Sequence, residues 1–391
     1  MSRELPTPAR FQGLFSRPER PNPSVLSVYL DVDQSRQSNL NRGFENQLRD
    51  LMSSIQASIR EESEHESFTR ASRHIVDFVS AYEPHGRGLA LFFDDTDGFF
   101  WHTALNLSLH NRADWGGELL LQPLANAIDQ FEPYSVVLID RNHLRLFTVF
   151  LCEIREILHK ELGLERVRHI KTAGTDHLGS ASQMQRKADE QVRTNLRTVV
   201  KTVDKLLMDK PSRRLVLAGT PEVTAELGEL LPKRLALQVI GSFDIRMDAP
   251  AQDILAAAQK IADENERAAE VQIVKEVVTA AAKYEKAVIG LGHTLKALNS
   301  NRIWEFVYSE DFTSPGFECA GCGALFSVEK TSCAYCSGAV RPVKDVVERA
   351  VEHALRNGAR IEVVTGEASA ALDTAGGIGA FLRTRTATVQ L

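Results

Sequence analysis

Apolar positions recur along the chain in three successive groups that predict alternating strands and helices. The first group begins with an apolar, β-prone run over residues 25–31. A helix is predicted next, because its apolar residues recur at spacings of three and four: Phe44, Leu48, Leu51, Ile55 and Ile59. Residues 88–93 and 98–105 are predicted as two strands around a turn, and residues 123–130 as a short helix. We therefore expect an α/β domain over residues 1–132.

The second group surrounds a long stretch without apolar periodicity, residues 164–183. Loops of this length in compact domains are usually functional or disordered. The helix predicted after it has this apolar face: Val192, Leu196, Val199, Val203 and Leu206. Four strands are predicted around the loop and helix: 135–140, 143–151, 214–218 and 236–240. These elements predict a middle domain over residues 133–272.

The third group follows a stretch, residues 250–290, that is rich in Ala, Glu, Lys and Gln and has no interior Pro or Gly. This composition predicts one long helix or two abutting helices. The elements predicted after it are a helix at 292–298, a strand at 303–308, a cysteine-rich insertion, a helix at 342–357 and a strand at 360–364. We expect a C-terminal α/β domain over residues 273–391, and an α/β (α+β) chain of three mixed-sheet domains.

Composition excludes several classes of protein. A chain of 391 residues with 43% hydrophobic and 25% charged residues is neither mostly disordered nor fibrous. No run is apolar for long enough to span a bilayer, and the N-terminus has no apolar secretory stretch, so we expect a cytoplasmic monomer without membrane contact. The net charge of -6 means that any surface for RNA must be a local patch.

Four of the five cysteines form two Cys-x-x-Cys pairs, Cys319-Ala-Gly-Cys322 and Cys333-Ala-Tyr-Cys336, with ten residues between them. In a reducing compartment such pairs are more often metal ligands than disulfides. Four thiolates in two tight turns suit tetrahedral Zn²⁺, and a site closed by four protein ligands has no position for a catalytic water. We expect a structural zinc knuckle over residues 317–340; vestigial or redox-active thiols are the alternative.

A basic cluster covers the predicted loop and the start of the helix after it. Its seven cations are Arg166, Arg168, Lys171, Arg186, Lys187, Arg193 and Arg197. Four carboxylates lie among them, Glu165, Asp176, Asp189 and Glu190, which leaves a local excess of three positive charges. Because phosphate neutralisation by Lys and Arg supplies most non-specific RNA affinity, this cluster is a candidate RNA-binding surface. The alternative is a solvated helix face beside a disordered loop.

Several stretches of the last two-thirds of the chain occur in the order found in one known family. Arg214-Leu-Val-Leu-Ala-Gly-Thr220 is a strand and turn, and residues 293–298 and 303–308 are a helix and a strand. The strand at 359–365 is followed by Gly376-Gly-Ile-Gly-Ala-Phe-Leu-Arg383. In order and content these stretches resemble the archaeal and eukaryotic class-1 peptide release factor family, which includes the ribosome-rescue protein Pelota.

Three functional motifs of the family are missing from this chain. In the family that this chain resembles, the members that read stop codons carry Asn-Ile-Lys-Ser and Tyr-x-Cys-x-x-x-Phe motifs in the N-terminal domain. Neither motif occurs here. The resemblance also implies a Gly-Gly-Gln loop before the basic helix, and that place falls at His177-Leu178-Gly179, with the nearest glutamine at Gln183. The chain is therefore more similar to the family's bacterial branch, which includes the ribosome hibernation factor Balon.

From this resemblance we expect a ribosome-binding translation factor that occupies the vacant A site and is not an enzyme. The implied partners are ribosomal RNA of both subunits, the P-site tRNA and a translational GTPase, which we expect to be elongation factor Tu. The candidate RNA-binding residues are Arg166, Arg168, His169, Lys171, His177, Gly179, Gln183, Arg186, Lys187, Arg193 and Arg197. One alternative is a rescue or termination factor that promotes peptidyl-tRNA hydrolysis with Gln183 and Gly179. Another is a non-ribosomal RNA-binding protein on the same scaffold.

Overall fold

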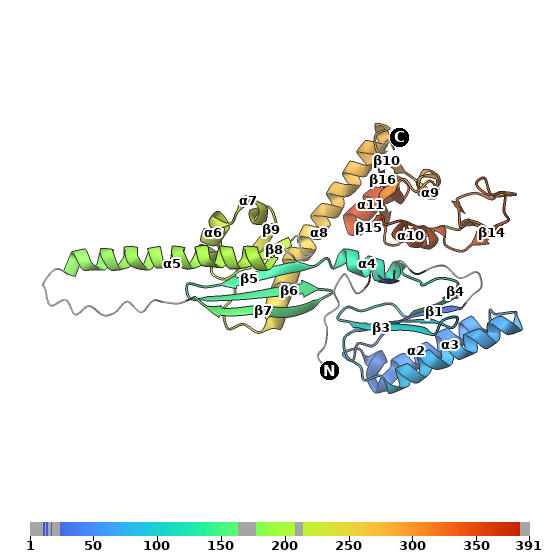
Figure 1. The fold of residues 1–391 in the computed structure, drawn as a ribbon, viewed down its shortest axis with the longest axis horizontal. Helices are drawn as coiled ribbons and strands as arrows, with labels where there is room; N and C mark the ends of the chain where they lie inside the picture. Colours follow the sequence, from blue (N-terminus) through green and yellow to red (C-terminus); the bar gives the residue numbers. More distant parts are fainter. Residues whose placement is uncertain are drawn as a thin grey trace, which may run out of the picture. The chain divides into compact units, whose positions relative to one another are not determined.

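The computed structural model describes residues 11, 13, 14, 17, 24–162, 177–207 and 214–383. It separates into two compact units (Figure 1). Unit 1 contains Met1–Gln130 with Glu266–Leu391, and unit 2 contains Phe131–Asn265. Both units combine helices with β-sheets, and each contains a sheet with both parallel and antiparallel strands, which confirms the predicted fold class. The division into three domains stays a prediction.

The N-terminal part of unit 1 is an antiparallel sheet of strand order β3-β2-β1-β4. Its elements are β1 (Val25–Asp31), η1 (Gln37–Arg42), α2 (Gly43–Gln56), α3 (Glu62–Ala81), β2 (Gly88–Asp94), β3 (Phe99–Leu105) and β4 (Arg112–Gly116). Alternate residues of β1, Leu26, Val28 and Leu30, share a core with α2 and α3, so both helices cover the same face of the sheet. The strand predicted at 25–31 is confirmed at both ends.

Unit 2 is built on a five-stranded mixed sheet of order β7-β6-β5-β8-β9. Its elements are β5 (Tyr134–Ile139), β6 (His143–Phe150), β7 (Glu153–Glu161), α5 (His177–Leu207), β8 (Arg214–Ala218), α6 (Pro221–Leu230), α7 (Lys233–Ala236) and β9 (Val239–Phe243). The buried residues of α5, Leu196, Val199 and Val203, pack on one face of the sheet together with α6. The first half of α8 (Ala251–Ala282) packs on the other face through Ile254 and Ala258.

Helix α5 begins six residues before the expected end of the loop. The loop was predicted to run through Gln183, but α5 starts at His177. Residues 177–183 contain no proline, and Gly179 lies in the first turn, where the amide groups have no helical partner in any case. A polar stretch without apolar periodicity can therefore still be helical when it continues a well-packed helix. The long helix predicted at 250–290 is confirmed as the single helix α8, but it ends at Ala282, and the last predicted residues form the strand β10 (Ala287–Ile289).

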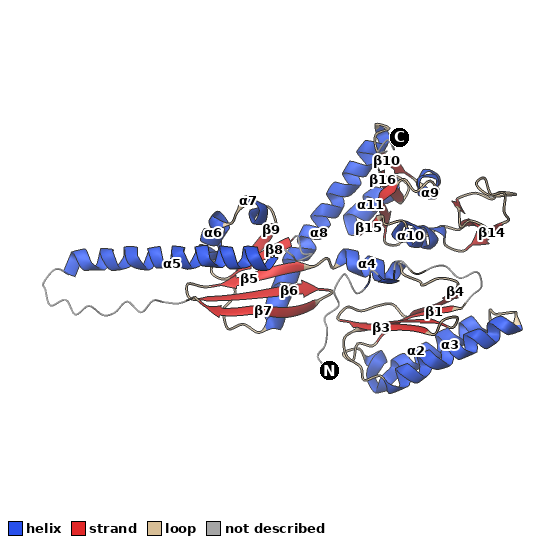
Figure 2. Cartoon of the chain, viewed as in Figure 1, coloured by secondary structure: helices blue, strands red, loops and turns tan. Residues whose placement is uncertain are grey.

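The C-terminal part of unit 1 is a four-stranded sheet of order β10-β16-β11-β15, with helices on both faces (Figure 2). Its elements are β10 (Ala287–Ile289), α9 (Leu291–Asn299), β11 (Ile303–Ser309), α10 (Val346–Arg356), β15 (Arg360–Val364), α11 (Gly366–Thr374) and β16 (Ile378–Leu382). Helices α9 and α10 cover one face, and α11 with the second half of α8 covers the other. Gly377, at φ 73°, forms the tight turn before β16, where a Cβ would lie 2.2 Å from the Phe312 ring.

Helix α4 (Gln122–Gln130) joins the two sheets of unit 1. Its Asn126 accepts a hydrogen bond from the Tyr308 hydroxyl at 2.5 Å, and the Asp129 carboxylate accepts one from the Val363 amide at 2.7 Å. Tyr308 lies on β11 and Val363 on β15, so the helix predicted at the end of the N-terminal domain packs on the C-terminal sheet. Within unit 1, these polar contacts hold the N-terminal part of the chain against the C-terminal sheet.

A buried group of charged residues on α10 lies at the same junction. Arg349 contacts Glu352 at 3.1 Å and Glu118 at 3.9 Å, Arg356 also pairs with Glu118, and Arg112 pairs with Glu348. Burial raises the pKa of Glu352 to about 8, and burial also raises the pKa of Glu348. Both carboxyl groups therefore hold a proton more tightly in the folded chain than in the unfolded one.

This pKa shift predicts a pH-dependent stability of unit 1. Because the folded-state pKa of Glu352 lies above its ordinary value of 4.5, its contribution to the free energy of unfolding is complete below that value and decreases as the pH rises towards 8. Thermal unfolding should give a lower midpoint at pH 8 than at pH 5.5. In Glu352→Gln, which cannot ionise, the decrease should be smaller; an unchanged decrease would mean that other groups cause it.

Candidate metal centre and RNA-binding helix

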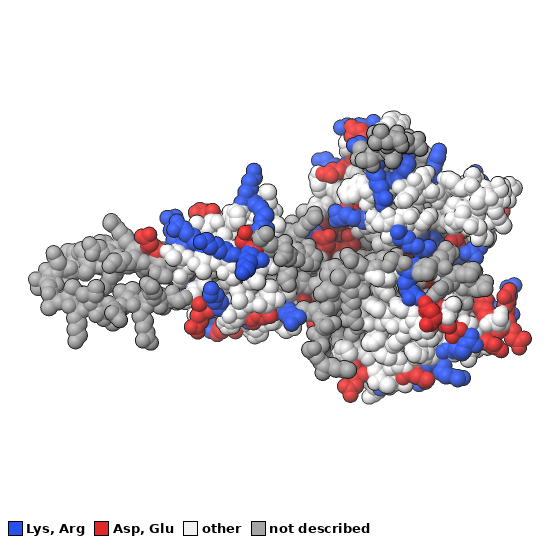
Figure 3. All heavy atoms as spheres, viewed as in Figure 1, with Lys and Arg blue, Asp and Glu red and all other residues white. Residues whose placement is uncertain are grey.

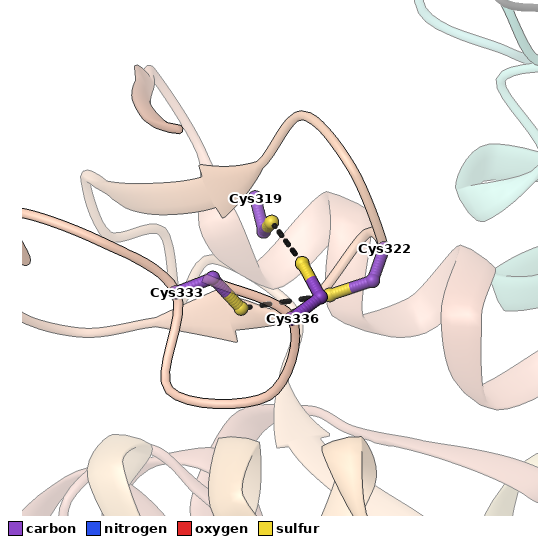
Figure 4. Close-up of side chains that lie close together, drawn as sticks. All are labelled: Cys319, Cys322, Cys333 and Cys336. Atoms are coloured by element: carbon purple, nitrogen blue, oxygen red, sulfur yellow. Dashed lines mark hydrogen bonds between the residues drawn. The ribbon is translucent and has the colours of Figure 1, made fainter. Parts of the chain in front are cut away.

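The four predicted cysteine ligands converge in unit 1 (Figure 4). Cys319 ends the short strand β12 (Gly316–Cys319), which pairs with β13 (Leu325–Phe326) and β14 (Val340–Val343). All four sulfur atoms lie within 4.8 Å of one another, with Sγ–Sγ distances of 3.4 Å for Cys319–Cys336 and 3.5 Å for Cys322–Cys333. The edge of a tetrahedron with metal–sulfur bonds of ~2.3 Å measures about 3.8 Å. The sequence brings the donors together at the separation that a tetrahedral metal requires.

The first Cys-x-x-Cys pair is held by a defined turn. The Gly321 amide points at the Cys319 Sγ at 3.4 Å, and the Gly323 amide donates to the Cys319 carbonyl at 2.9 Å. Gly323 has φ 70°, a left-handed conformation that glycine adopts without strain. The Cys319 amide in turn donates to Ala324 at 2.9 Å. These bonds fix the sulfur of Cys319 and direct an amide dipole at it.

The second pair repeats the first, bond for bond. Tyr335 donates its amide to the Cys333 Sγ at 3.4 Å, Ser337 to the Cys333 carbonyl at 2.9 Å, and Cys333 to the Gly338 carbonyl at 2.9 Å. Ser337 occupies the left-handed position that Gly323 holds in the first turn, with φ 62°. Two equivalent turns therefore present their sulfur atoms to a common centre, an arrangement that two unrelated free thiol pairs have no reason to form.

The environment of the sulfur atoms favours a bound cation. Burial raises the pKa of Cys322 to about 12. Burial acts in the same direction on Cys333, but the amides of Tyr335 and Cys336 and the neighbouring thiols outweigh it and lower that pKa to about 6. At neutral pH Cys333 therefore loses its proton more readily than Cys322. A bound dication would also release the protons of the other thiols, because metal-bound thiols are deprotonated.

The insertion has little apolar core of its own. The buried members of its cluster are Cys319, Ala324 and Cys333, with Phe326 and Val340 packed against them. Two of these three buried residues are candidate ligands, so packing alone supplies little stability. The residues fit a structural metal, because four soft donors converge, two amide dipoles point at the sulfurs, and the apolar core of the insertion is small. Among the described residues, this is the one group of cysteine, histidine and carboxylate side chains that could hold a metal ion.

Gly338 provides a test of how closely the backbone approaches the sulfurs. A Cβ at this position would lie 3.2 Å from the Cys336 Sγ and 3.3 Å from the Cys319 Sγ. We expect Gly338→Ala to displace both sulfurs and to weaken metal retention about tenfold or more, the usual scale for groups that support metal ligands. Competition with a chromogenic chelator measures this, with Gly228→Ala in α6, where the added Cβ would meet only the Leu217 side chain at 4.0 Å, as the control. Equal retention in both variants would mean that the sulfurs have room to move.

The candidate RNA-binding residues fall into three groups. Arg166, Arg168, His169 and Lys171 lie outside the described residues. Helix α5 contains His177, Gly179, Gln183, Arg186 and Lys187, whose side chains are likewise outside the description, and Arg193 and Arg197, which are exposed. The Arg193 guanidinium lies 3.4 Å from the Glu226 carboxylate of α6. The described part of the cluster therefore presents two cations from one exposed face of α5.

Two basic residues on that face were not singled out from the sequence. Lys201 and Lys205 are exposed, and they continue the spacing of four residues set by Arg193 and Arg197. Residues four apart lie on the same side of an α-helix and about 6 Å apart along its axis. We call these four residues the basic stripe; Figure 3 shows Lys and Arg side chains along this part of α5. Its signal in the sequence is the i, i+4 spacing of cations opposite the apolar positions Val199 and Val203.

A groove of about 610 Å³ lies beside the basic stripe within unit 2. Its lining includes Arg141 from the β5–β6 turn, Arg193 and Arg197 from α5, and Glu222 and Glu226 from α6. The Asn195 side-chain amide donates to the Arg141 carbonyl at 3.1 Å, which fixes this turn against α5. Glu190 of α5 lines the groove as well, so the groove combines cations with carboxylates and is not a uniformly basic pocket.

Residues 120–263 match the family model of bacterial archaeo-eukaryotic release factor family 10. The match covers α4, the sheet of unit 2 and α5, so the resemblance found in the sequence is confirmed for this region. A search among curated protein sequences found no relative of this chain. In the described part of the chain, none of the helices has the length and apolar character needed to cross a membrane.

Three solved structures are similar to the whole chain or to most of it. An archaeal translation termination factor, aRF1, has 16% identity and a TM-score of 0.27, with 96% of this chain and 97% of that chain covered. Archaeoglobus fulgidus Pelota has 13% identity and a TM-score of 0.36, with coverage of 75% and 79%. An archaeal Pelota from a model of ribosome-bound Pelota and ABCE1 has 12% identity and a TM-score of 0.43, with coverage of 97% and 94%. The family match over residues 120–263 is the stronger of these findings.

Proposed function

We propose, from the family match of residues 120–263, that this chain is a ribosome-binding translation factor that occupies the vacant A site. The observation that carries the proposal is the match to a release-factor family model in a chain without any Gly-Gly-Gln sequence. Release chemistry needs a group positioned on the water that attacks the peptidyl-tRNA ester. A factor that has the release-factor framework without that motif acts by occupancy, as a hibernation or protection factor, and not as an enzyme.

Helix α5 supports a contact with ribosomal RNA. The basic stripe repeats about every 6 Å, close to the spacing of successive phosphates along an RNA strand, and its side chains are exposed. The net charge of -6 opposes long-range approach to a polyanionic particle, so affinity depends on such local contacts. The arginines and histidines of the predicted loop before α5 lie outside the described residues and would add further RNA contacts.

The metal in this proposal is Zn²⁺, and its role is structural. Cys319, Cys322, Cys333 and Cys336 would hold it, and four protein ligands leave no open coordination position. When bound, zinc supplies cohesion to an insertion that has little core of its own. The C-terminal part of unit 1 would contact a translational GTPase, elongation factor Tu in a bacterial cell, and the N-terminal sheet would face the decoding centre and the P-site tRNA.

A peptide-release assay tests the proposed mode of action. Ribosomes carrying labelled peptidyl-tRNA in the P site are mixed with the full chain, with either a stop or a sense codon in the vacant A site. We expect the protein to bind without releasing peptide above background. Release that disappears in Gln183→Ala would instead show a rescue or termination factor, and absence of any ribosome association would favour a non-ribosomal RNA-binding protein.

A further inference from the structure

One end of the C-terminal sheet of unit 1 gathers basic side chains. The strand order β10-β16-β11-β15 places four cations side by side, from the starts of β10, β11 and β15 and the end of β16: Lys286, Arg302, Arg360 and Arg383. Backbone bonds fix their order, because the Leu382 amide donates to the Lys286 carbonyl at 2.8 Å and the Arg383 amide to the Arg302 carbonyl at 2.6 Å. Adjacent strands lie about 4.8 Å apart, so the row is about 15 Å long.

Most of these cations lack a neutralising partner in the structure. Arg360 lies 3.5 Å from the buried Glu305, and Arg383 donates to the carbonyls of Ile303 and Asn357. Within the described ranges, Lys286 and Arg302 have no carboxylate within ion-pair distance. Elsewhere the chain commonly neutralises its arginines, as with Arg17 and its two aspartates. Lys286 and Arg302 therefore leave an excess of positive charge at this end of the sheet, in a chain whose net charge is -6.

Two aromatic residues are exposed at the same end. Tyr284, in the turn between α8 and β10, is 97% exposed and is flanked by Lys283. Trp304 is 41% exposed and lies in a β-bulge, because the β11–β16 register shifts between Ile303 and Glu305. Its ring contacts Phe381 on the neighbouring strand at a centroid distance of 6.0 Å. A bulge redirects a side chain, and here it leaves one indole partly in solvent beside the basic row.

We propose that this end of the sheet, with Lys283, Lys286, Arg302, Tyr284 and Trp304, binds unpaired RNA. Positive charge tracks the phosphates, and the exposed phenol and indole rings stack on bases, the combination that recognises single-stranded nucleic acid without sequence preference. An acidic protein segment would pair with the cations, but it would gain little from a tyrosine that is almost completely exposed on a left-handed turn at φ 56°. The surface lies outside the region matched by the family model and does not depend on the basic stripe of α5.

Binding of the full chain to a fluorescein-labelled 15-nucleotide uridine-rich RNA, measured by fluorescence anisotropy at several salt concentrations, tests this surface. The triple variant Lys283→Gln, Lys286→Gln, Arg302→Gln should bind about tenfold more weakly, with a salt slope smaller by about two, since each single-strand phosphate contact contributes ~0.7. Tyr284→Ala should lose about tenfold in affinity and keep its salt slope, because stacking is not ionic.

The matched control is Lys296→Gln, Lys330→Gln, Lys344→Gln, which removes the same charge from exposed positions of the same unit. It should bind the RNA like the wild type. Equal RNA affinity in the control, the triple variant and Tyr284→Ala would overturn the proposal. So would binding of a glutamate-rich peptide that the triple variant loses while its RNA affinity is unchanged, because the surface would then be a protein-binding one. Circular dichroism of each variant confirms that it is folded.

Discussion

The purified protein should contain one zinc ion per chain, and Cys333→Ser should lose it and unfold the insertion. Cys333 is buried at the start of the second turn, and its sulfur lies 3.5 Å from that of Cys322. Structural zinc binding in small domains supplies about 10 kcal/mol or more of apparent free energy at neutral pH, and all of it appears as folding free energy. Elemental analysis gives the stoichiometry, and limited proteolysis between residues 317 and 340 reports the unfolding.

Cys152→Ser is the control for this variant, because Cys152 lies in unit 2 and outside the cysteine cluster. It should keep the metal and the protease resistance of the insertion. Wild-type protein that is prepared without chelator, remains fully folded and contains no metal would contradict the metal assignment. A different tetrahedral ion, such as iron, would preserve the structural role and correct only the identity.

Replacing the basic stripe, Arg193, Arg197, Lys201 and Lys205, with glutamine should weaken ribosome binding by about 3–4 kcal/mol, or 10²- to 10³-fold. Glutamine keeps the helix propensity and the length of the side chains, so the loss reports charge. Each lost phosphate contact also lowers the slope of log affinity against log salt by up to about 0.9, and four contacts lower it by about three to four. Sedimentation with ribosomes between 50 and 200 mM salt measures both quantities.

A fourfold variant in unit 1, Lys275→Gln, Lys296→Gln, Lys330→Gln, Lys344→Gln, separates this effect from the overall charge. It changes the net charge by the same amount at exposed positions of unit 1. The basic-stripe variant should lose affinity and salt dependence, and the unit 1 variant should keep both. If both variants bind alike, general electrostatic attraction accounts for binding and α5 does not contact ribosomal RNA.

Strong apolar patterns predicted much of the fold from the sequence. The strands at 25–31, 214–218 and 360–364 are rich in apolar residues, and each was predicted within a residue of its observed ends. Helix α3 was missed because its buried residues, Phe68, Ala71, Ile75 and Val79, lie among charged and polar neighbours. Strand β4 was missed because all of its residues are partly exposed, so buried and exposed positions do not alternate along it.

The metal centre could be predicted more completely than the RNA-binding helix. Ligand identity and spacing are local properties of a sequence, so the four cysteines were sufficient to predict that their sulfurs converge. The α5 surface depends on which face of a helix is buried, which the sequence shows only through weak apolar periodicity. The sequence did predict Val199 and Val203 as part of the apolar face, and their packing in the core of unit 2 confirms it, so Lys201 and Lys205 could have been placed on the opposite face but were not singled out. The contacts of α4 with β11 and β15 join residues more than 180 positions apart, and no local pattern encodes them.

Competition for the A site tests the central proposal most directly. Vacant ribosomes are sedimented with the full chain, either with an empty A site or after the A site has been filled with aminoacyl-tRNA. We expect the protein to sediment with vacant ribosomes at near-stoichiometric ratio, and we expect prior occupancy of the A site to remove most of it from the pellet. Binding that is equally strong with the A site filled, or no binding to either form of the ribosome, would contradict the proposal.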